Sequence, residues 1–224
     1  MVNTGRISMQ TTRRATREPI PVDDPDGDVY DLVDHGDVRG ALRQLMQRHG
    51  AAVYRYCRAT LRDEALAEDV HQQVFIEAFR DLPRFEGRST VRTWLFTIAR
   101  NRVIDAGRAR SRRQSHLEEV EIQDAPDPRP LAGESIDDAR LREALVASLD
   151  ELGHDLRAAV LLRYQQGFTF EAMAEVCCEK PGTLQARVAR ALLQLRARIE
   201  ARLGGSHVVT SLDRRDKPSR RGTR

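Results

Sequence analysis

An arginine-rich stretch, residues 87–113, holds the side chains best suited to a chemical task. Trp94 and Phe96 stand in it among aliphatic residues, as they would in a core helix. The same stretch carries arginines at positions 88, 92, 100, 102, 108, 110, 112 and 113. Clustered guanidinium groups mark polyanion-binding surfaces, so the composition predicts a helix that packs on one side and binds a polyanion on the other.

No comparable pattern of residues indicates catalysis or metal binding. There is no nucleophile–histidine–acid constellation, no glycine-rich phosphate loop and no His-Glu-x-x-His motif, so no catalytic residue and no cofactor is predicted. The cysteines, Cys57, Cys177 and Cys178, are odd in number and lack the paired spacing of a zinc site, so no metal is predicted. Buried thiols are the favoured interpretation, and a redox or metal role for the adjacent pair is the alternative.

Charge is segregated along the 224 residues, although the net charge is only +3. Residues 84–113 hold nine arginines against two acids, whereas residues 117–138 hold eight acids against one arginine. With 40% hydrophobic and 5% aromatic residues, the composition favours helices over a β-sandwich. No apolar run is long enough to span a bilayer and the N-terminus lacks a signal-peptide core, so a cytoplasmic location is expected.

The elements that must position these residues fall into two blocks, and the predicted fold is all-α, with two small helical domains joined by a flexible acidic linker. The expected segments are a disordered tail (1–27), a first helical domain (28–113), the linker (114–136), a second helical domain (137–203) and a basic disordered tail (204–224).

Local signals place the helices of the first domain. Five apolar residues follow an unbroken i, i+4 spacing, with Phe75 and Phe79 beside them: Leu66, Val70, Val74, Ala78 and Leu82. Asp63 is predicted to open this helix and Pro83 to end it. Ser89 or Thr90 caps the next helix, which Gly107 and the arginine run are expected to end.

In the second domain, two helices joined by a tight turn predict a helix-turn-helix, with the first over residues 169–178 and the second from Pro181. The candidate DNA-contacting residues are Thr169, Lys180, Thr183, Gln185, Ala186, Arg187 and Arg190. An ordinary helical hairpin in a bundle is an equally weighted alternative.

Together the two blocks resemble a bacterial sigma factor of the sigma-70 family, in the compact extracytoplasmic-function (ECF) group that keeps only the second and fourth conserved regions. The D-x-x-Q-x-x-F core is Asp69, Gln72 and Phe75. The segments R-T-W-L and I-A-R-N are residues 92–95 and 98–101, and the resemblance covers about residues 28–203. It implies a promoter-specificity subunit, not an enzyme, which binds core RNA polymerase at the β′ coiled coil and β flap, promoter DNA, and an anti-sigma factor.

The resemblance also implies two surfaces in the first domain. The core-polymerase-binding surface would comprise Asp69, Gln72, Gln73, Phe75, Ile76 and Arg80. The minus-ten DNA surface would comprise Arg88, Arg92, Trp94, Arg100, Asn101, Arg102, Asp105 and Arg108. Core packing is the favoured alternative for Trp94. Asp105 either orients an arginine or forms a surface salt bridge.

The second domain departs from the family pattern. Cys178 and Glu179 replace a glycine and an aliphatic residue in the turn, and Gln185 and Ala186 replace a lysine and a serine. Leu192 and Leu193 stand at two further positions that are often basic in the family. Because a leucine in place of a cation loses a phosphate contact and adds apolar surface, we expect weaker or altered recognition of the minus-thirty-five element. The same helix would be able to bind a protein partner. The alternatives are a regulator that has lost minus-thirty-five recognition, and a sigma mimic that sequesters an anti-sigma factor without initiating transcription.

Overall fold

The computed structural model describes residues 25–114 and 136–204, which are helical throughout apart from short turns and loops. They form the N-terminal block (residues 25–114) and the C-terminal block (residues 136–204). The elements are α1 (Gly27–Asp34), α2 (Val38–Leu61), α3 (Glu64–Asp81), the 3-10 helix η1 (Leu82–Arg84), α4 (Val91–Gln114), α5 (Ile136–Asp150), α6 (His154–Val160), the π-helical segment η2 (Leu161–Gln165), α7 (Phe170–Cys177) and α8 (Pro181–Arg202). The all-α prediction is confirmed. Most of the predicted linker and tails lies outside the described residues.

Helix starts follow the local signals. The Asp63 carboxylate accepts the backbone N–H of Leu66 at 2.9 Å at the start of α3. Of the two candidates before α4, Thr90 is the cap, since its hydroxyl accepts from the backbone N–H of Thr93 at 3.1 Å. Such side-chain acceptors satisfy amides that lack partners in the first turn of a helix.

Gly107 does not end α4, contrary to the prediction, because the helix continues to Gln114. A Cβ atom at position 107 would lie 3.1 Å from Nδ1 of His154 in α6. The glycine therefore allows close packing between α4 and α6. In the interior of a helix it lowers helix stability by about 1 kcal/mol relative to alanine.

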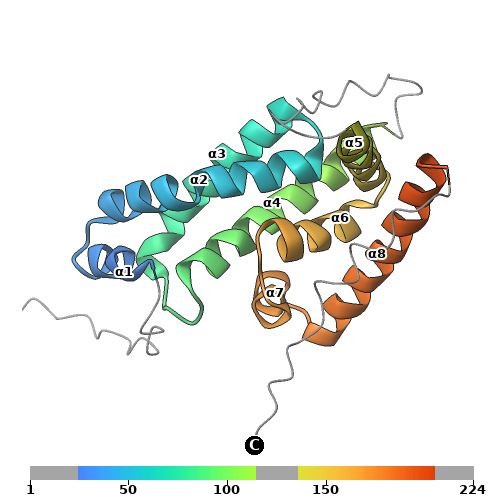
Figure 1. The fold of residues 1–224 in the computed structure, drawn as a ribbon. Helices are drawn as coiled ribbons and strands as arrows, with labels where there is room; N and C mark the ends of the chain where they lie inside the picture. Colours follow the sequence, from blue (N-terminus) through green and yellow to red (C-terminus); the bar gives the residue numbers. More distant parts are fainter. Residues whose placement is uncertain (1–24, 115–135, 205–224) are drawn as a thin grey trace, which may run out of the picture.

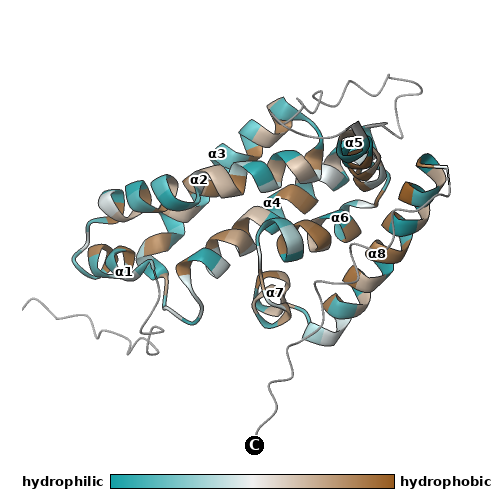
Figure 2. Ribbon diagram, viewed as in Figure 1, coloured by the Kyte–Doolittle hydropathy of each residue, from teal (hydrophilic) through white to brown (hydrophobic). Residues whose placement is uncertain are grey.

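The N-terminal block buries the predicted stripe of α3. Val70, Val74, Ala78 and Leu82 are buried and pack with α2 and α4, whereas Leu66, the first residue of the stripe, is only partly buried. Figure 2 shows hydrophobic and hydrophilic residues alternating along these helices, as an amphipathic packing requires.

The two blocks share one hydrophobic core. Helix α4 crosses the centre of the molecule, with α2 and α3 on one side and α6 and α7 on the other (Figure 1). Leu95 and Phe96 of α4 belong to the same buried cluster as Leu162, Phe168 and Met173 of the C-terminal block. A smaller core, built around Leu152, Val160, Ala191 and Leu195, holds α8 against α6. No pattern in the residues indicates that the two blocks pack together.

Asp26 was expected in the disordered tail, but it is fully buried at the start of α1. Its carboxylate lies 2.8 Å from Nε2 of His49 and 3.3 Å from the guanidinium of Arg48. Burial alone would raise the pKa of Asp26, but hydrogen bonds and charge from His49 and Arg48 outweigh burial and lower it. The ionised carboxylate thus fastens the first residues of the block to α2.

We expect Asp26→Asn to lower the free energy of unfolding by about 1–2 kcal/mol at pH 7, because a charge-assisted hydrogen bond becomes a neutral one. A folded-state pKa below the ordinary 3.8 means that the ionised group stabilises the fold above that value and stops doing so as the pH falls through the folded pKa. Urea unfolding from about pH 7 to pH 2 should show the gap between wild type and variant closing only below about pH 4. The exposed Asp105→Asn is the control; a gap that does not depend on pH would contradict the assignment.

Candidate protein- and nucleic-acid-binding surfaces

The outer face of α3 carries an exposed apolar side chain among polar ones. Ile76 is 60% exposed. Around it the side chains of Asp69, Gln72, Gln73 and Arg80 are exposed as predicted. An apolar group on a rigid helix flanked by amides is suited to a partner helix.

Two phenylalanines exchange roles relative to the prediction. Phe75 is only 5% exposed and packs edge-on against His71, with 5.0 Å between ring centroids, so its side chain is not available to a partner. Phe79 is 42% exposed and lies one turn after Ile76 on the outer face. The sequence analysis places both rings beside the buried stripe and assigns only Phe75 to the core-polymerase-binding surface, although the i, i+3 spacing from Ile76 could have identified Phe79 instead. The surface of Gln72, Gln73, Ile76 and Phe79 is called the α3 face below.

An ion pair joins α3 to α4 beside the α3 face. The Arg102 guanidinium lies 2.6 Å from the Glu77 carboxylate, which also contacts Arg80 at 3.5 Å. Arg80 in turn contacts Asp81 at 2.8 Å. These contacts hold α4 in a fixed register beside α3 and partly neutralise Arg80 and Arg102.

Of the predicted minus-ten residues, several are open to solvent. Asn101, Asp105 and Arg108 are exposed on α4, Arg102 is partly exposed, and Arg88 is exposed in the preceding loop beside Glu86. Trp94 is instead partly buried against Phe85, with 5.1 Å between ring centroids. This contact supports the core-packing alternative for Trp94.

Arg92 faces the C-terminal block. Its guanidinium carbon lies 4.1 Å from the centre of the Phe168 ring and 5.4 Å from that of Phe96, and the group donates a hydrogen bond to the backbone carbonyl of Gln166. Burial lowers the pKa of Arg92, although a guanidinium remains charged in proteins. The cation–π and carbonyl contacts take the place of water around this charge.

Arg100 also faces the C-terminal block, and it meets a predicted helix-turn-helix residue there. The Glu179 carboxylate receives both Arg187 nitrogens, at 2.8 and 2.6 Å, and lies 3.7 Å from the guanidinium of Arg100. The Arg187 hydrogen bond and charge, together with Arg100, lower the pKa of Glu179. One carboxylate therefore holds cations of both proposed DNA surfaces.

The helix-turn-helix elements form as predicted. Thr169 caps α7, accepting from the N–H of Ala172 at 3.1 Å, and Cys178 ends it in the left-handed region at φ 54°. Most of the candidate contact residues are exposed at the start of α8: Lys180, Thr183, Gln185, Ala186 and Arg190. Further along the helix Leu192 and Leu193 are 40% and 70% exposed. The beginning of α8 is thus accessible, whereas Arg187 is held by Glu179.

Arg157, which sequence reasoning missed, joins the two blocks. It is 5% exposed and donates to four backbone carbonyls, those of Thr60 in α2 and of Leu149, Asp150 and Leu152 in and after α5. These oxygens lie at helix C-termini, where carbonyls lack intrahelical partners and a cation is favoured. No spacing rule marks this arginine among the many in the sequence.

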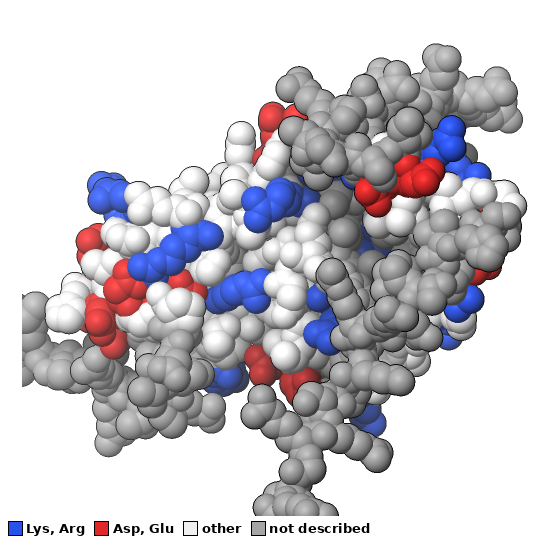
Figure 3. Space-filling view, viewed as in Figure 1, with Lys and Arg blue, Asp and Glu red and all other residues white. Residues whose placement is uncertain are grey.

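Other polar contacts cross between the blocks. The Arg62 guanidinium lies 2.5 Å from the Asp150 carboxylate, and the Gln166 amide lies 3.4 Å from the backbone carbonyl of Ala52. On the face of Figure 3 the lysine and arginine side chains form several separate patches, some beside acidic side chains and others surrounded by uncharged surface. The arginine run is therefore divided between solvent, ion pairs and the contact between blocks.

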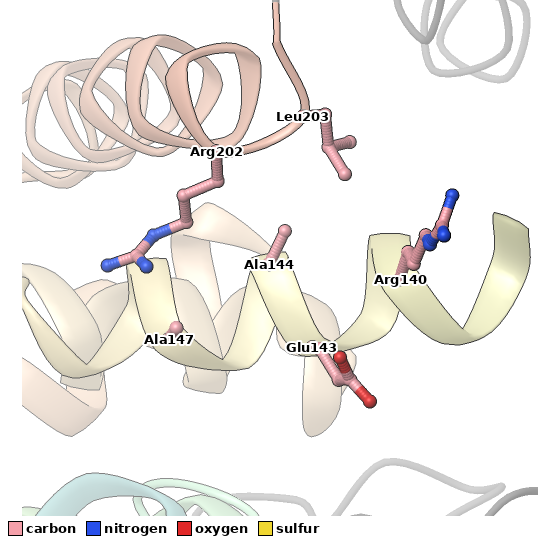
Figure 4. A pocket seen from close by; sticks show the side chains of 6 residues that line it. All are labelled: Arg140, Glu143, Ala144, Ala147, Arg202 and Leu203. Carbon is pink, nitrogen blue, oxygen red and sulfur yellow. The ribbon is translucent and has the colours of Figure 1, made fainter.

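A hollow between α5 and the end of α8 is lined by Arg140, Glu143, Ala144, Ala147, Arg202 and Leu203. Figure 4 shows Glu143 pointing away from α8, while Arg202 also pairs with Glu151 on the adjoining surface. These six residues do not converge on a common point, so the hollow provides no argument for a ligand site.

The thiols follow the favoured interpretation in two of three cases. Cys57 and Cys177 are buried and Cys178 is exposed. Burial raises the pKa of the Cys57 thiol to about 12 and also raises that of Cys177, which makes both thiols poor nucleophiles. Within residues 25–114 and 136–204 no three His, Cys, Asp or Glu side chains are grouped to hold a metal ion. Nor is any described helix both long and apolar enough to cross a membrane.

Comparison with known proteins gives consistent relatives. The family profile described as Sigma-70 region 2 matches residues 45–113. The chain is 32% identical over 179 residues to the ECF RNA polymerase sigma factor SigE of Mycolicibacterium smegmatis, covering 79% of this chain and 68% of that protein. It is 31% identical over 156 residues to the RNA polymerase sigma factor CarQ of Myxococcus xanthus, covering 70% and 87%.

Two solved structures share the fold. One is the sigma factor RpoE in complex with the anti-sigma factor NepR from Bartonella quintana, at 27% identity and TM-score 0.55, covering 74% of this chain and 98% of that one. The other is CnrH in complex with the cytosolic domain of CnrY, at 25% identity and TM-score 0.59, covering 79% and 97%.

Proposed function

The chain belongs to the ECF group of the bacterial sigma-70 family, and on this premise we propose that it binds core RNA polymerase in the cytoplasm and directs it to a set of promoters. It would recognise and melt the minus-ten element and contact the minus-thirty-five element. Sigma factors are transcription initiation factors and not enzymes in themselves. The observation that carries the proposal is the α3 face, an exposed apolar patch on a helix fixed from both sides.

The α3 face suits the β′ coiled coil of core polymerase. Ile76 and Phe79 provide apolar area, while Gln72 and Gln73 provide donors and acceptors at the edge. Such a centre, surrounded by polar groups that exclude water, concentrates binding energy in few side chains. The C-terminal block would contact the β flap.

The minus-ten surface is centred on the exposed side of α4. Arg102, Arg108 and Arg88 would neutralise the backbone of the unwound strand, and Asn101 can hydrogen-bond a base edge. For the minus-thirty-five element, the exposed start of α8 supplies Lys180, Thr183, Gln185, Ala186 and Arg190.

An anti-sigma factor is a further proposed partner. Of the two related structures described above, one holds a sigma factor with an anti-sigma factor, and the other holds CnrH with the cytosolic domain of CnrY. Leu192 and Leu193, exposed on α8, give a protein apolar surface that DNA phosphates would not use.

The proposal is tested by binding of the purified chain to bacterial core RNA polymerase. We expect Ile76→Asp to weaken binding by about 30-fold or more, because a charge replaces the central apolar side chain of the α3 face. Leu145→Asp, at an exposed leucine of α5, is the matched control and should bind as wild type does.

Equal binding by wild type and Ile76→Asp would show that the α3 face is not the contact. Failure of the folded wild-type chain to bind core polymerase would favour the sigma mimic, a protein-interaction module. Capture of an anti-sigma factor without transcription from any promoter would then be the expected activity.

A further inference from the structure

Arg102 lies on α4 where the predicted minus-ten surface adjoins α3, and its guanidinium is held at one nitrogen only. The Nε atom donates to the Glu77 carboxylate at 2.6 Å. Within residues 25–114 and 136–204 the two Nη nitrogens make no hydrogen bond. The side chain is 43% exposed. The edge formed by the two Nη nitrogens is therefore open to a ligand, while Nε fixes the group to α3.

Glu77 is committed mainly to Arg102. Its side chain is 20% exposed, and the other cation beside it, Arg80, lies at 3.5 Å. Arg80 makes its closer contacts with Asp81, at 2.8 and 2.9 Å. The hydrogen bond and charge of Glu77 raise the pKa of Arg102, and Asp105 adds a smaller effect through its charge. Arg102 thus has one principal partner, which comes from a different helix.

Three other predicted minus-ten arginines lack this combination of a fixed position and an open edge. Arg88 lies 3.2 Å from Glu86, but the two side chains are 79% and 60% exposed, and ion pairs so open to water are weak. Arg92 and Arg100 face the C-terminal block. Arg102 is both anchored on a rigid helix and accessible.

A guanidinium with a free pair of Nη nitrogens matches a backbone phosphate. Its N–H groups can donate in parallel to two phosphate oxygens. An arginine that moves freely in solvent loses rotamer freedom when it binds, which lowers affinity. Because Glu77 already restricts Arg102, less freedom is lost. The Glu77 charge also repels a phosphate, so position and charge affect affinity in opposite directions.

We propose that Glu77 is a positioning residue of the minus-ten surface, which holds Arg102 through Nε so that its two Nη nitrogens bind one backbone phosphate of the unwound strand. The inference rests on the proposed function, since it assumes that α4 binds single-stranded promoter DNA. Glu77 acts through Arg102 and does not itself contact the strand. Because Glu77 follows Ile76 in α3, the phosphate contact is anchored to the helix that faces core polymerase.

Two substitutions at position 77 separate position from charge, because both remove the same charge. Glu77→Gln keeps an oxygen that can accept from Arg102, whereas Glu77→Ala keeps none. Both residues are good helix formers, so α3 is retained. Each substitution is made in the full chain, once with Arg102 and once with Arg102→Gln. Asp81→Asn, which removes a carboxylate paired with Arg80, is the control for a change of charge nearby.

The probe is a fluorescein-labelled single-stranded DNA oligonucleotide, with affinity read by fluorescence anisotropy over a range of salt concentrations, with and without core polymerase. We expect Glu77→Ala to bind about fivefold more weakly than Glu77→Gln, because Arg102 loses its fixed position. With Arg102→Gln the two substitutions should give equal affinities.

Salt dependence gives a second measure of the same contact. Each phosphate contact on a single strand contributes about 0.7 to the slope of log affinity against log salt. Glu77→Ala and Arg102→Gln should both flatten the slope, by up to about that amount. Glu77→Gln and Asp81→Asn should keep the wild-type slope, because both leave Arg102 with an acceptor for its Nε.

Equal affinities of Glu77→Ala and Glu77→Gln would overturn the positioning role, because Glu77 would then act through its charge alone. A difference that persists with Arg102→Gln would also overturn it, since the effect would not pass through Arg102. In both cases a wild-type chain that binds the oligonucleotide and core polymerase leaves the proposed function standing. A folded wild-type chain that binds neither overturns the proposed function, and the positioning role with it.

Discussion

Arg157→Met should lower the free energy of unfolding by about 4 kcal/mol or more. The guanidinium donates to four backbone carbonyls and is 5% exposed. Methionine fills a similar volume but donates to none of these oxygens, of which that of Leu149 keeps the backbone N–H of Leu152 at 3.1 Å. Each buried acceptor left unpaired costs about 1–3 kcal/mol, some of which local rearrangement recovers. Two helix C-termini, those of α2 and α5, would lose their cap together.

Urea unfolding followed by circular dichroism measures this loss. Arg196→Met is the matched control, since Arg196 is exposed in an ion pair with Glu200 and should change stability by no more than about 0.5 kcal/mol. Arg157→Lys should fall between the two, because an ammonium cannot reach four oxygens in the plane of a guanidinium. An Arg157→Met protein as stable as wild type would show that the contact between blocks is not built on this residue.

Phe168→Ala should cost about 3–5 kcal/mol, the range found when a buried phenylalanine is truncated. The ring is 2% exposed, packs against Phe96, and lies under the guanidinium of Arg92. Its removal leaves a cavity and an uncovered charge at the same place. Because the ring belongs to the shared core, the loss should fall mainly on the attachment of the C-terminal block.

The single tryptophan, Trp94, reports on the N-terminal block, while circular dichroism reports on both blocks. In Phe168→Ala we expect the two urea transitions to separate, with part of the helical signal lost before Trp94 fluorescence changes. Phe79→Ala is the control; Phe79 is 42% exposed, so the substitution should leave stability nearly unchanged and weaken core polymerase binding instead. Equal destabilisation by the two substitutions would contradict the burial on which both predictions depend.

Features set by neighbouring residues could be predicted from the sequence. Asp63, Thr90 and Thr169 cap their helices because the cap needs only a short polar side chain and the next three amides. The stripe on α3 is buried because its spacing leaves one possible inward face. The open side of that helix, with Ile76 and the glutamines, follows from the same geometry.

Features that depend on distant partners could not be predicted. Gly107 looked like a helix end, because the ring of His154 that it accommodates comes from another element. Phe75 and Phe79 are both apolar, and only the positions of neighbouring helices decide that one is buried and the other exposed. Arg157, Arg92 and Arg100 have the same chemistry as the solvent arginines, so the sequence cannot tell which of them cross to the other block.

The placement of one carboxylate between Arg100 and Arg187 has a consequence for the ionic strength at which the protein works. Binding to DNA releases counterions, so added salt weakens it in proportion to the phosphates contacted. The pairs of Glu179 are partly open to solvent, so the same salt also weakens the hold of that carboxylate on Arg100 and Arg187. The two effects oppose each other wherever these arginines exchange the carboxylate for a phosphate. The DNA affinity of the chain would therefore fall less steeply with salt than the number of its DNA-contacting cations implies.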